Sequence, residues 1–313
     1  MRIKAFTYSI FGAVAVMLSS CSSKDEPQPV ATGTINLSFK YDNNMTGDDW
    51  FAKEISSVAV WAFDKNGKIV WSHSEKIDQS TAEDFSITAN IPVGEYNFVT
   101  WCGLTSEMPM LPTLSPSSIS QLNLSIPIAD DECKAKLPAI FNGNARDITI
   151  SEDESNDLTF NLTRVTKDLR IIIQGVGVHV NSDELDFAIT NAPNTLEWDM
   201  TLKSTAKFEY LPYNVESSID ETAAPGLETP DYSIVIADFS TLCFDEDRAP
   251  TLIIKRRSDG RTILNISLVS CFLQAKPFEA DSWSNQEYLD RKNDYTLAFF
   301  FDDKLLTKSS LEQ

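Results

Sequence analysis

Apolar side chains recur at every second position in short runs along most of the chain, and turn residues separate these runs. Between residues 122 and 128, leucine and isoleucine alternate with Asn, Ser and Pro, and residues 158–162 and 264–268 repeat the pattern. Successive side chains of a β-strand point to opposite faces of a sheet, so each run places its aliphatic groups on one face. Sustained helical periodicity is scarce, and the sequence therefore predicts an all-β protein.

Two pairs of these runs are joined by residues typical of hairpin turns. Asn66-Gly67 separates an apolar run at 58–63 from another at 69–70, and this pair tolerates the positive φ angles of a type I′ turn. Asp259-Gly260 lies between the runs at 252–254 and 263–266. The sequence thus predicts one hairpin in each half of the chain.

The expected strands fall into two sets, each of a size that suits a β-sandwich. The first set covers residues 34–41, 56–64, 68–73, 85–91, 95–101, 121–128, 147–150 and 157–163, and the second covers 168–175, 184–190, 195–202, 206–210, 232–238, 250–256, 262–272 and 294–301. A chain of 313 residues is long enough for about two domains. We expect one sandwich over residues 34–165 and another over 166–313, and we expect residues 214–230 to form a long exposed loop.

The first residues have the form of an export signal. Arg2 and Lys4 precede an uncharged apolar stretch at 5–18, which is too short to span a bilayer comfortably and is typical of a secretory signal peptide. The sequence Leu18-Ser19-Ser20-Cys21 resembles the bacterial lipobox, in which the cysteine thiol receives diacylglycerol. The alternative is an ordinary signal peptide followed by a chance cysteine. We expect residues 1–20 to be removed and residues 21–33 to form a lipidated tether.

The net charge of the full chain and the predicted lipid on Cys21 bear on what the protein can bind. The formal net charge of −20 repels phosphate backbones and anionic lipid, so no nucleic-acid partner is expected. Acyl chains on Cys21 would hold the protein to the membrane, since each buried methylene contributes about 0.8 kcal/mol. Lys24, Asp25 and Glu26 resemble the signal that sends Bacteroidetes lipoproteins to the outer face of the outer membrane, although a solvated linker has a similar composition.

Four cysteines remain once Cys21 is assigned to lipid. Cys102, Cys243 and Cys271 stand beside apolar residues, whereas Cys133 lies between Glu132 and Lys134. Export permits disulfides, but free buried thiols fit these neighbours somewhat better, and the sequence leaves the choice open. Their spacing does not resemble a zinc site, and we expect no metal and no cofactor.

Signals for catalysis are weak. The chain has two histidines, His73 and His179, and it lacks the glycine and histidine motifs of common hydrolases, nucleotide-binding proteins and zinc proteases. Acidic groups at 48–49, 130–132 and 245–247 could bind calcium or cleave glycosides, but solvated loops explain them better. No catalytic residue is expected, and the sequence predicts a protein that is not an enzyme.

Three passages resemble a known family. Residues 58–67 form an aromatic strand that ends in Asn-Gly, residues 94–103 contain Gly-x-Tyr followed by Trp-Cys-Gly, and residues 286–301 combine a short acidic turn with a final hydrophobic strand. In this order, and after a lipobox, they are similar to the FimB/Mfa-type fimbrial anchor lipoproteins of Bacteroidales, which belong to type V pili.

The resemblance implies two tandem transthyretin-like Greek-key β-sandwich domains behind a lipoprotein signal peptide. It also implies a surface protein, held by lipid to the outer membrane, that attaches a fimbrial shaft and limits its length through strand-addition contacts with a pilin subunit. Stalk pilins of such systems lose an N-terminal strand to a protease. Between Cys21 and Thr34 the only basic residue is Lys24, so this chain has no obvious target for that cleavage.

A strand that adds to the edge of another sheet satisfies unpaired backbone groups while alternate side chains fill pockets. Residues 295–301 (YTLAFFF) are the candidate partner strand, and its contact residues would be Tyr295, Leu297, Phe299 and Phe301. The alternative is an ordinary core strand of the second domain, because successive phenylalanines are more often buried.

Two other functions share the same sequence features. A surface glycan-binding lipoprotein of a polysaccharide-uptake system would also carry a lipobox and β-sandwiches, and Trp283, in a polar segment, is the best candidate for an exposed sugar-stacking residue. Trp61 and Trp101 fit better as core residues. A carboxylate glycosidase is the third possibility and would need two facing carboxyl groups about 5 to 10 Å apart.

Overall fold

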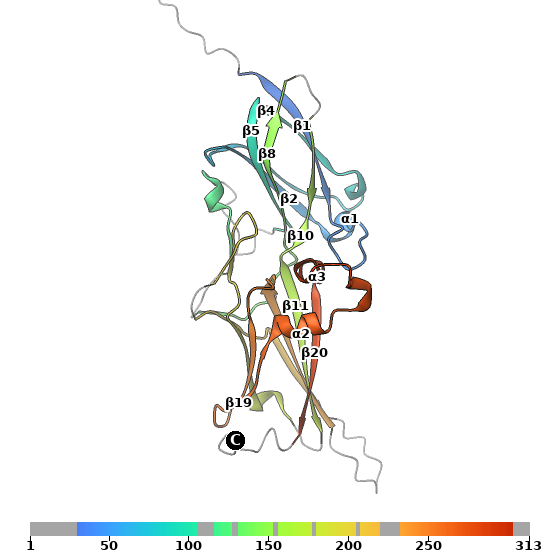
Figure 1. Ribbon diagram of the computed structural model, residues 1–313, viewed down its shortest axis with the longest axis vertical. Helices are drawn as coiled ribbons and strands as arrows, with labels where there is room; N and C mark the ends of the chain where they lie inside the picture. The colour runs from blue at the N-terminus through green and yellow to red at the C-terminus, as the bar shows by residue number, and fades with distance from the viewer. Residues whose placement is uncertain are drawn as a thin grey trace, which may run out of the picture.

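The computed structural model describes residues 30–104, 116–126, 131–152, 156–176, 180–204, 207–219 and 232–302. The protein is elongated, with strands of the first half of the chain at one end and strands of the second half at the other (Figure 1). Strands predominate, and short helices gather near the junction of the two halves. The predicted all-β class is confirmed.

Two sheets form the first half. One has the order β4-β1-β9 and the other the order β10-β8-β5-β2-β3. Along β1, buried and exposed residues alternate, as expected for a strand with one face on a core. Phe98 and Phe160 are among the buried residues between the two sheets. The strand bounds are β1 Thr32–Lys40, β2 Ser57–Asp64, β3 Ile69–Lys76, β4 Ser86–Pro92, β5 Gly94–Cys102, β8 Phe141–Ile150, β9 Asn156–Asn161 and β10 Thr163–Arg164.

Two further sheets form the second half, with the orders β16-β17-β11-β20 and β19-β18-β12-β15-β7. Their inner faces share a core that includes Ile171, Phe187 and Phe239. The strand bounds are β7 Glu132–Cys133, β11 Thr166–Val176, β12 Leu185–Thr190, β15 Glu209–Tyr210, β16 Asn214–Ile219, β17 Tyr232–Leu242, β18 Thr251–Arg256, β19 Thr262–Ser267 and β20 Asp294–Asp302.

The two halves place their first and last strands in the same way. In the first half, β1 pairs antiparallel with β4 and parallel with β9. In the second half, β11 pairs antiparallel with β17 and parallel with β20. The last strand of each half therefore lies at the edge of its sheet, beside the first strand.

A segment from the first half of the sequence packs into the second. Strand β6 (Leu124–Ser125) joins β13 (Thr195–Leu196) and β14 (Leu202–Lys203) in a small sheet, and β7 pairs with β15. Trp61 and Trp101 face this shared core and are 1% and 0% exposed. The indole N–H of Trp101 donates to the carbonyl of Leu122 at 3.3 Å. Both tryptophans are core residues, as predicted.

Among the described residues, three α-helices interrupt the strands: α1 Phe51–Glu54, α2 Leu268–Gln274 and α3 Asn285–Arg291. Short 3-10 turns occupy Ala82–Asp84, Ile119–Gln121, Ser182–Glu184 and Phe278–Ala280. The expected strand 262–272 is wrong in its second part, because the Ser267 side chain accepts a hydrogen bond from the Ser270 N–H at 3.4 Å and caps α2. In the same way Ser284 caps α3, where an acidic turn was expected.

Other strand expectations need correction. Residues 214–219 of the expected loop form β16, because β17 offers them a pairing partner that their own weak alternation does not reveal. The expected strand 121–128 is reduced to β6 among its described residues, and the strand expected at 147–150 begins at Phe141. The expected strand 195–202 divides into β13 and the start of β14, with a turn between them.

Both predicted hairpins form, but the first turn is of another type. Gly67 has a φ of 74°, whereas Asn66 does not have the positive φ that a type I′ turn requires. The Gly67 N–H donates to the Asp64 carbonyl at 2.8 Å, and the Asp64 carboxylate accepts from the N–H groups of Asn66 and Lys68. An aspartate thus closes the turn from its first position.

Within the described part of the chain, the helices are too short to cross a bilayer. Cys102, Cys133, Cys243 and Cys271 are free thiols, and the first three are buried. Burial raises the pKa of the Cys102 and Cys243 thiols to about 12, so these two groups stay protonated and unreactive at neutral pH.

Candidate functional site

The predicted site residues fall in two places. Cys21 and the Lys24, Asp25 and Glu26 triplet lie outside the described residues. The described chain starts at Val30, beside the start of β1, at the end of the molecule formed by the first half (Figure 1). The candidate partner strand is β20, and it runs through the second half toward the opposite end.

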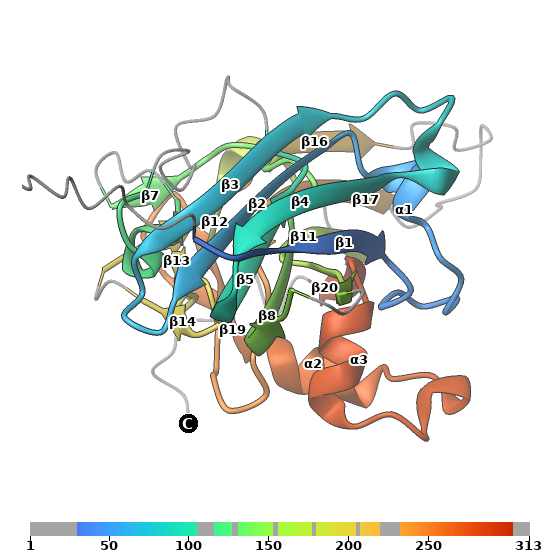
Figure 2. The same cartoon turned by 90° about the horizontal axis from the view of Figure 1, so that it is seen from above.

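Strand β20 lies at the edge of its sheet. It pairs in parallel with β11 over its whole length, from Asp168 opposite Asp294 to Val176 opposite Asp302. The sheet order gives β20 no neighbour on its other side within the described residues. Figure 2, seen from above, shows β20 next to β11, with α2 and α3 nearby.

The four predicted contact residues all face the core. Tyr295 and Phe301 are 2% exposed, and Leu297 and Phe299 are partly buried against the same cluster. The Tyr295 ring stacks on Phe272 of α2, with centroids 3.9 Å apart, and its hydroxyl donates to the Leu289 carbonyl at 3.2 Å. These side chains hold β20 onto its own sandwich, as the core-strand alternative predicted.

The backbone of β20 is nevertheless available on one side. The Asp168 N–H donates to the Asn293 carbonyl at 2.9 Å, so the odd-numbered residues from 293 to 301 direct their backbone groups toward β11. The N–H and C=O groups of the alternate residues, which include Thr296, Ala298 and Phe300, point to the open edge. A free edge of this kind is a template for another strand.

The outer face of the same sheet carries apolar side chains near its far end. Gln174 lies between Ile234 and Phe300 in the sheet register, and Ile172 lies between Ile236 and Ala298. Phe300 is 64% exposed and Ile234 is 38% exposed. We call these apolar residues the distal patch: Ile172, Ile234, Ile236, Ala298 and Phe300. The sequence prediction named only the inward-facing residues of this strand, although Phe300 lies between Phe299 and Phe301 and so faces the opposite side.

Two residues closer to the junction along β11, the outer face becomes charged. Arg170 contacts both carboxylate oxygens of Asp238, at 2.7 Å from Nε and 3.1 Å from Nη2. This hydrogen bonding holds the pKa of Asp238 below its ordinary value. The pair borders a small hollow of about 290 Å³ that reaches Thr296 of β20. A partner strand along β20 would thus pass from polar to apolar surroundings.

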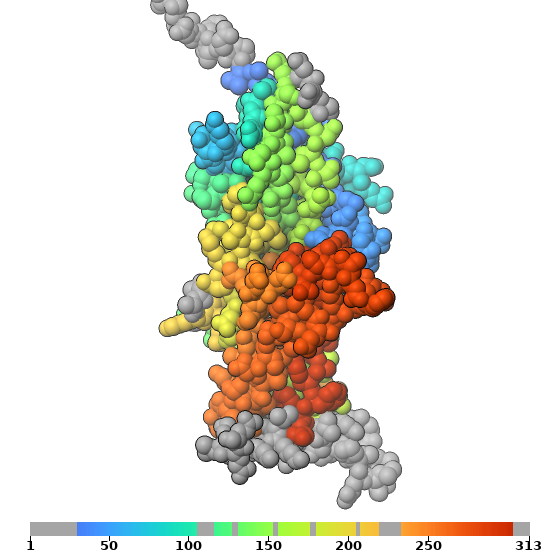
Figure 3. Space-filling model, in the orientation of Figure 1, coloured from blue at the N-terminus to red at the C-terminus, as the bar shows by residue number. Residues whose placement is uncertain are grey.

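Side chains at the start of β20 connect the two halves of the molecule. Arg291 donates from Nη1 to the carbonyls of Asp42 at 3.1 Å and Asn44 at 3.2 Å, and Asn293 donates from Nδ2 to the Tyr41 hydroxyl at 2.6 Å. In Figure 3, the segment that contains α2 and α3 (orange to red) abuts the first half (blue) at this level. The position of β20 is therefore fixed relative to both halves.

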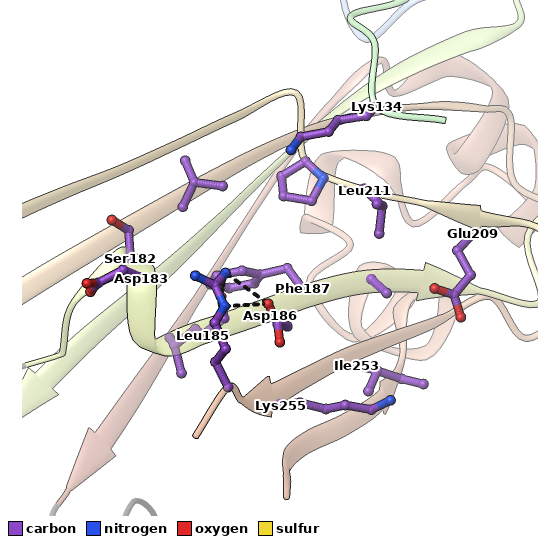
Figure 4. Close-up of a pocket in the computed structure, with 14 residues that line it drawn as sticks. Lys134, Ser182, Asp183, Leu185, Asp186, Phe187, Glu209, Leu211, Ile253 and Lys255 are labelled. Carbon is purple, nitrogen blue, oxygen red and sulfur yellow. Dashed lines mark hydrogen bonds and ion pairs between the residues drawn. The ribbon is translucent and has the colours of Figure 1, made fainter. Parts of the chain in front are cut away.

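A groove of about 560 Å³ opens at the other edge of the second half, between β12 and β16 (Figure 4). Its walls include Leu185, Phe187 and Val215. Arg257 and Asp186 form an ion pair at 2.8 Å across one side. The remaining charged residues that line the groove are of both signs: Lys134, Asp183, Glu209 and Lys255.

The groove exists because the pairing between β12 and β15 ends after one residue pair. Strand β12 pairs with β15 only at Ile189 and Tyr210. If the same register continued, Pro212 would fall opposite Phe187. Proline has no N–H to donate, so pairing cannot continue there. The walls offer both charges and aliphatic side chains without an exposed aromatic ring, which suits an extended peptide better than a stacked sugar.

The histidine and acidic residues that could bind a metal ion or act in catalysis do not form a common site in the described part of the chain. The described part of the chain has no group of three or more His, Cys, Asp or Glu side chains placed to hold a metal ion. His73 pairs with Glu75 at 2.8 Å on the surface, and His179 lies outside the described residues. Asp49 accepts hydrogen bonds from the backbone N–H groups of Tyr41 and Phe51, which is a structural role.

Trp283 is less exposed than expected. The Arg291 guanidinium lies 4.7 Å from the centre of its ring, and Lys276 donates to its carbonyl at 2.6 Å. One face of the indole is therefore covered by an arginine that also holds the junction. This arrangement does not favour Trp283 as a sugar platform.

Comparison with known proteins gives consistent results. A family model for the fimbrillin-A associated anchor proteins Mfa1 and Mfa2 matches residues 20–312. Among solved structures, a proposed adhesin from Bacteroides thetaiotaomicron has a TM-score of 0.72 at 22% identity and covers 90% of this chain and 94% of its own. A proposed polysaccharide-binding protein from the same organism has a TM-score of 0.70 at 24% identity and covers 87% of this chain and 92% of its own.

The fimbrial anchor protein Mfa2 from Porphyromonas gingivalis has a TM-score of 0.61 at 15% identity, with 85% of this chain and 90% of that chain covered. No curated protein matches the sequence significantly. The structural likenesses support the tandem β-sandwich fold, and the family match extends over nearly the whole chain.

Proposed function

The chain belongs to the family of fimbrillin-A associated anchor proteins Mfa1 and Mfa2, and we propose that it fixes a fimbrial shaft to the outer membrane. Family membership makes it a fimbrial accessory protein of the cell envelope with a structural role. The finer proposal concerns how it is held and what it holds. The observation that carries it is the edge of β20, which has no strand partner among the described residues and lies in the half of the molecule opposite to the one that contains Val30.

Attachment to the membrane is assigned to acyl chains on Cys21. More than one chain on a single thiol-bearing residue gives stable anchoring without a transmembrane helix. Lys24, Asp25 and Glu26, just after the lipid, are assigned to export to the cell surface. The tether is then shorter than the expected 21–33 and ends at residue 31, because β1 begins at Thr32 and pairs with β4. The two domains of the mature protein are assigned to the segments 32–165 and 166–313, and β6 and β7 of the first segment pack against the second.

Attachment to the shaft is assigned to β20. A pilin strand that pairs with the open edge would satisfy the backbone groups of Thr296, Ala298 and Phe300, which are strong hydrogen-bonding groups without a strand partner among the described residues. Its side chains would reach the distal patch on one face and Leu297 and Phe299 on the other. The open edge of β20 would pair with a strand of one pilin subunit. The shaft would therefore end at the subunit that is bound to the anchor.

Glycan binding is the second candidate. One of the similar structures is a proposed polysaccharide-binding protein, and a surface lipoprotein of this fold could serve that role. The arginine that covers Trp283 weighs against this candidate, and the groove beside β12 lacks an exposed aromatic ring. A glycan array on which the purified protein binds no saccharide would leave the anchor proposal as the better one.

The anchoring proposal is tested by Cys21→Ala, with Cys271→Ala as a matched cysteine control. We expect Cys21→Ala to release the protein, and the fimbriae with it, into the culture medium, while Cys271→Ala leaves both on the cells. Immunoblots and electron microscopy of cell and medium fractions measure this. Shafts that remain fully cell-bound in Cys21→Ala would contradict the proposal.

A further inference from the structure

Lys167 is a lysine in an unusual position. It is the second residue of β11, where the chain enters the second half, and it is 0% exposed. Charged groups are rarely buried without a partner, because removal of water from an ammonium group is costly. Salt bridges of the described residues do not include one to Lys167, so the structure must accommodate its amine in another way.

The amine has two acceptors. Its Nζ atom donates to the Asp290 carbonyl at 2.7 Å and to the Asn293 Oδ1 atom at 3.1 Å. A neutral amine has two N–H groups and an ammonium has three, so these two acceptors match the neutral form. Burial also lowers the pKa of Lys167 to about 8, which makes the neutral, nucleophilic form accessible near neutral pH.

The side-chain amide of Asn293 contacts Lys167 through its oxygen and Tyr41 through its nitrogen. Asn293 Nδ2 donates to the hydroxyl of Tyr41 at 2.6 Å, and the Tyr41 side chain is 1% exposed. The amide carbon of Asn293 is bonded to the oxygen that accepts from Lys167, so this carbon is one bond away from the atom that the amine already contacts. Two groups held in contact in this way react as if at very high local concentration.

We propose that Lys167 and Asn293 become joined by an intramolecular isopeptide bond. The lysine Nζ forms a bond to Cγ of Asn293, the Cγ–Nδ2 bond breaks, and one amine proton passes to the leaving nitrogen, so that ammonia is released. The exchange of one amide for another needs no oxidant or reductant. Tyr41, in contact with the leaving nitrogen, is the group placed to relay that proton.

A partly buried carboxyl group belongs to Asp290, a residue that contacts Lys167 through its backbone. Asp290 provides the carbonyl that accepts from Lys167, and burial raises the pKa of its own carboxyl group above the ordinary value. Its side chain accepts from Gln286 Nε2 at 2.8 Å. We assign Asp290 a positioning role, in which its backbone and side chain hold the end of α3 against the amine.

The bond would join the first and last strands of the second half at their shared end. Lys167 and Asn293 are 126 positions apart in the sequence, and they sit where β11 and β20 begin. Tension that enters through the junction and leaves through β20 would then pass across one covalent bond, and the rest of the sandwich would carry little of it. The bond itself does not depend on the proposed function, because its formation needs only the folded chain.

Tryptic digestion of the full-length protein tests the inference. Trypsin does not cleave after an acylated lysine, so the expected product is the peptide 165–170 linked to 293–304, with a mass lower than the sum of the two by one ammonia. Lys167→Met should abolish this product, whereas the neighbouring Lys292→Met should keep it, with the second peptide starting at residue 292. Tyr41→Phe should slow its appearance in freshly synthesised protein.

Mass spectrometry of the wild-type protein decides the matter even if a variant fails to fold. Separate peptides that end at Lys167 and start at Asn293, each with its unmodified mass, would overturn the inference. Loss of ammonia within the linear peptide that starts at Asn293 would also overturn it, because that result indicates a succinimide at Asn293-Asp294. On a reducing denaturing gel, the linked protein should migrate faster than Lys167→Met.

Discussion

The backbone N–H of Asp168 donates to the carbonyl of Asn293 at 2.9 Å, and this single hydrogen bond determines which backbone groups of the last strand remain free. Parallel pairing with β11 uses the odd-numbered residues of β20 and leaves Thr296, Ala298 and Phe300 on the open edge. The side chains of β20 secure it to its own core, while its backbone offers an edge to another strand. Strand β20 can therefore be a core strand through its side chains and a partner strand through its backbone.

A proline on the open edge should block strand addition without unfolding the protein. In Ala298→Pro, the lost N–H points away from β11, so the change in the free energy of unfolding should stay within about 1 kcal/mol. Binding to the shaft pilin should fall at least tenfold, as measured by surface plasmon resonance. Phe299→Pro is the contrast, since its N–H pairs with β11 and its ring packs on the core, and it should destabilise the fold by about 3 kcal/mol or more. Full pilin binding by Ala298→Pro would rule out this edge.

The distal patch should contribute to binding and not to stability. Phe300→Ser removes a ring that is 64% exposed, so urea unfolding should shift by no more than about 0.5 kcal/mol. The same variant should weaken pilin binding. Phe301→Ala, which removes a ring that is 2% exposed, should cost about 3 to 5 kcal/mol. Equal losses of stability in the two variants would show that the patch is part of the core.

The junction between the halves should depend on Arg291. Its guanidinium donates to the carbonyls of Asp42 and Asn44, so Arg291→Ala removes both bonds and should lower the free energy of unfolding by about 1 to 3 kcal/mol. Arg257→Ala, at an exposed pair with Asp186, is the control and should cost less than about 1 kcal/mol. Calorimetry should show a broader or divided transition only for Arg291→Ala. An unchanged transition would mean that the shared core alone joins the halves.

Acid should weaken the outer face of the β20 sheet. The hydrogen bonds from Arg170 hold the pKa of Asp238 below the value it has in the unfolded chain, so the folded state binds fewer protons at low pH. The contribution of the pair is present above the unfolded pKa of about 3.9 and is lost as the pH falls through the lower folded value. Because Arg170 is 53% exposed, we expect about 1 kcal/mol or less. The stability gap between wild type and Arg170→Met in urea should narrow from pH 7 toward strong acid, and a gap independent of pH would contradict this.

Much of the fold was predictable because the alternation of side chains is local. The period-two runs identified most long strands, and the aromatic character of Trp61 and Trp101 marked them as core residues. The elements that were predicted wrongly depend on contacts that a local pattern does not show. The pairing of Asn214–Ile219 with β17 overrides a weak local pattern, and a serine hydroxyl ends β19 at Ser267 and starts a helix. The type of the Asn66-Gly67 turn was wrong because Asp64 closes it with its side chain.

The candidate site was only partly predictable. The inward residues of β20 were identified by their hydrophobicity, but whether a strand lies at an edge depends on the order of strands in its sheet, which one sequence does not reveal. The distal patch combines residues of β11, β17 and β20, so it exists only once these strands are aligned. Lys167 and Asn293 meet for the same reason. The expected roles of Cys21 and of the Lys24 to Glu26 triplet stay predictions.

Hydrogen exchange of β20 in the presence of the shaft pilin tests the central claim most directly. In the free protein, the amides of Leu297 and Phe299 should already be protected by β11, while those of Thr296, Ala298 and Phe300 exchange quickly. When the pilin binds, we predict strong protection at Thr296, Ala298 and Phe300. Unchanged fast exchange at these three amides in a stable complex would contradict strand addition at this edge.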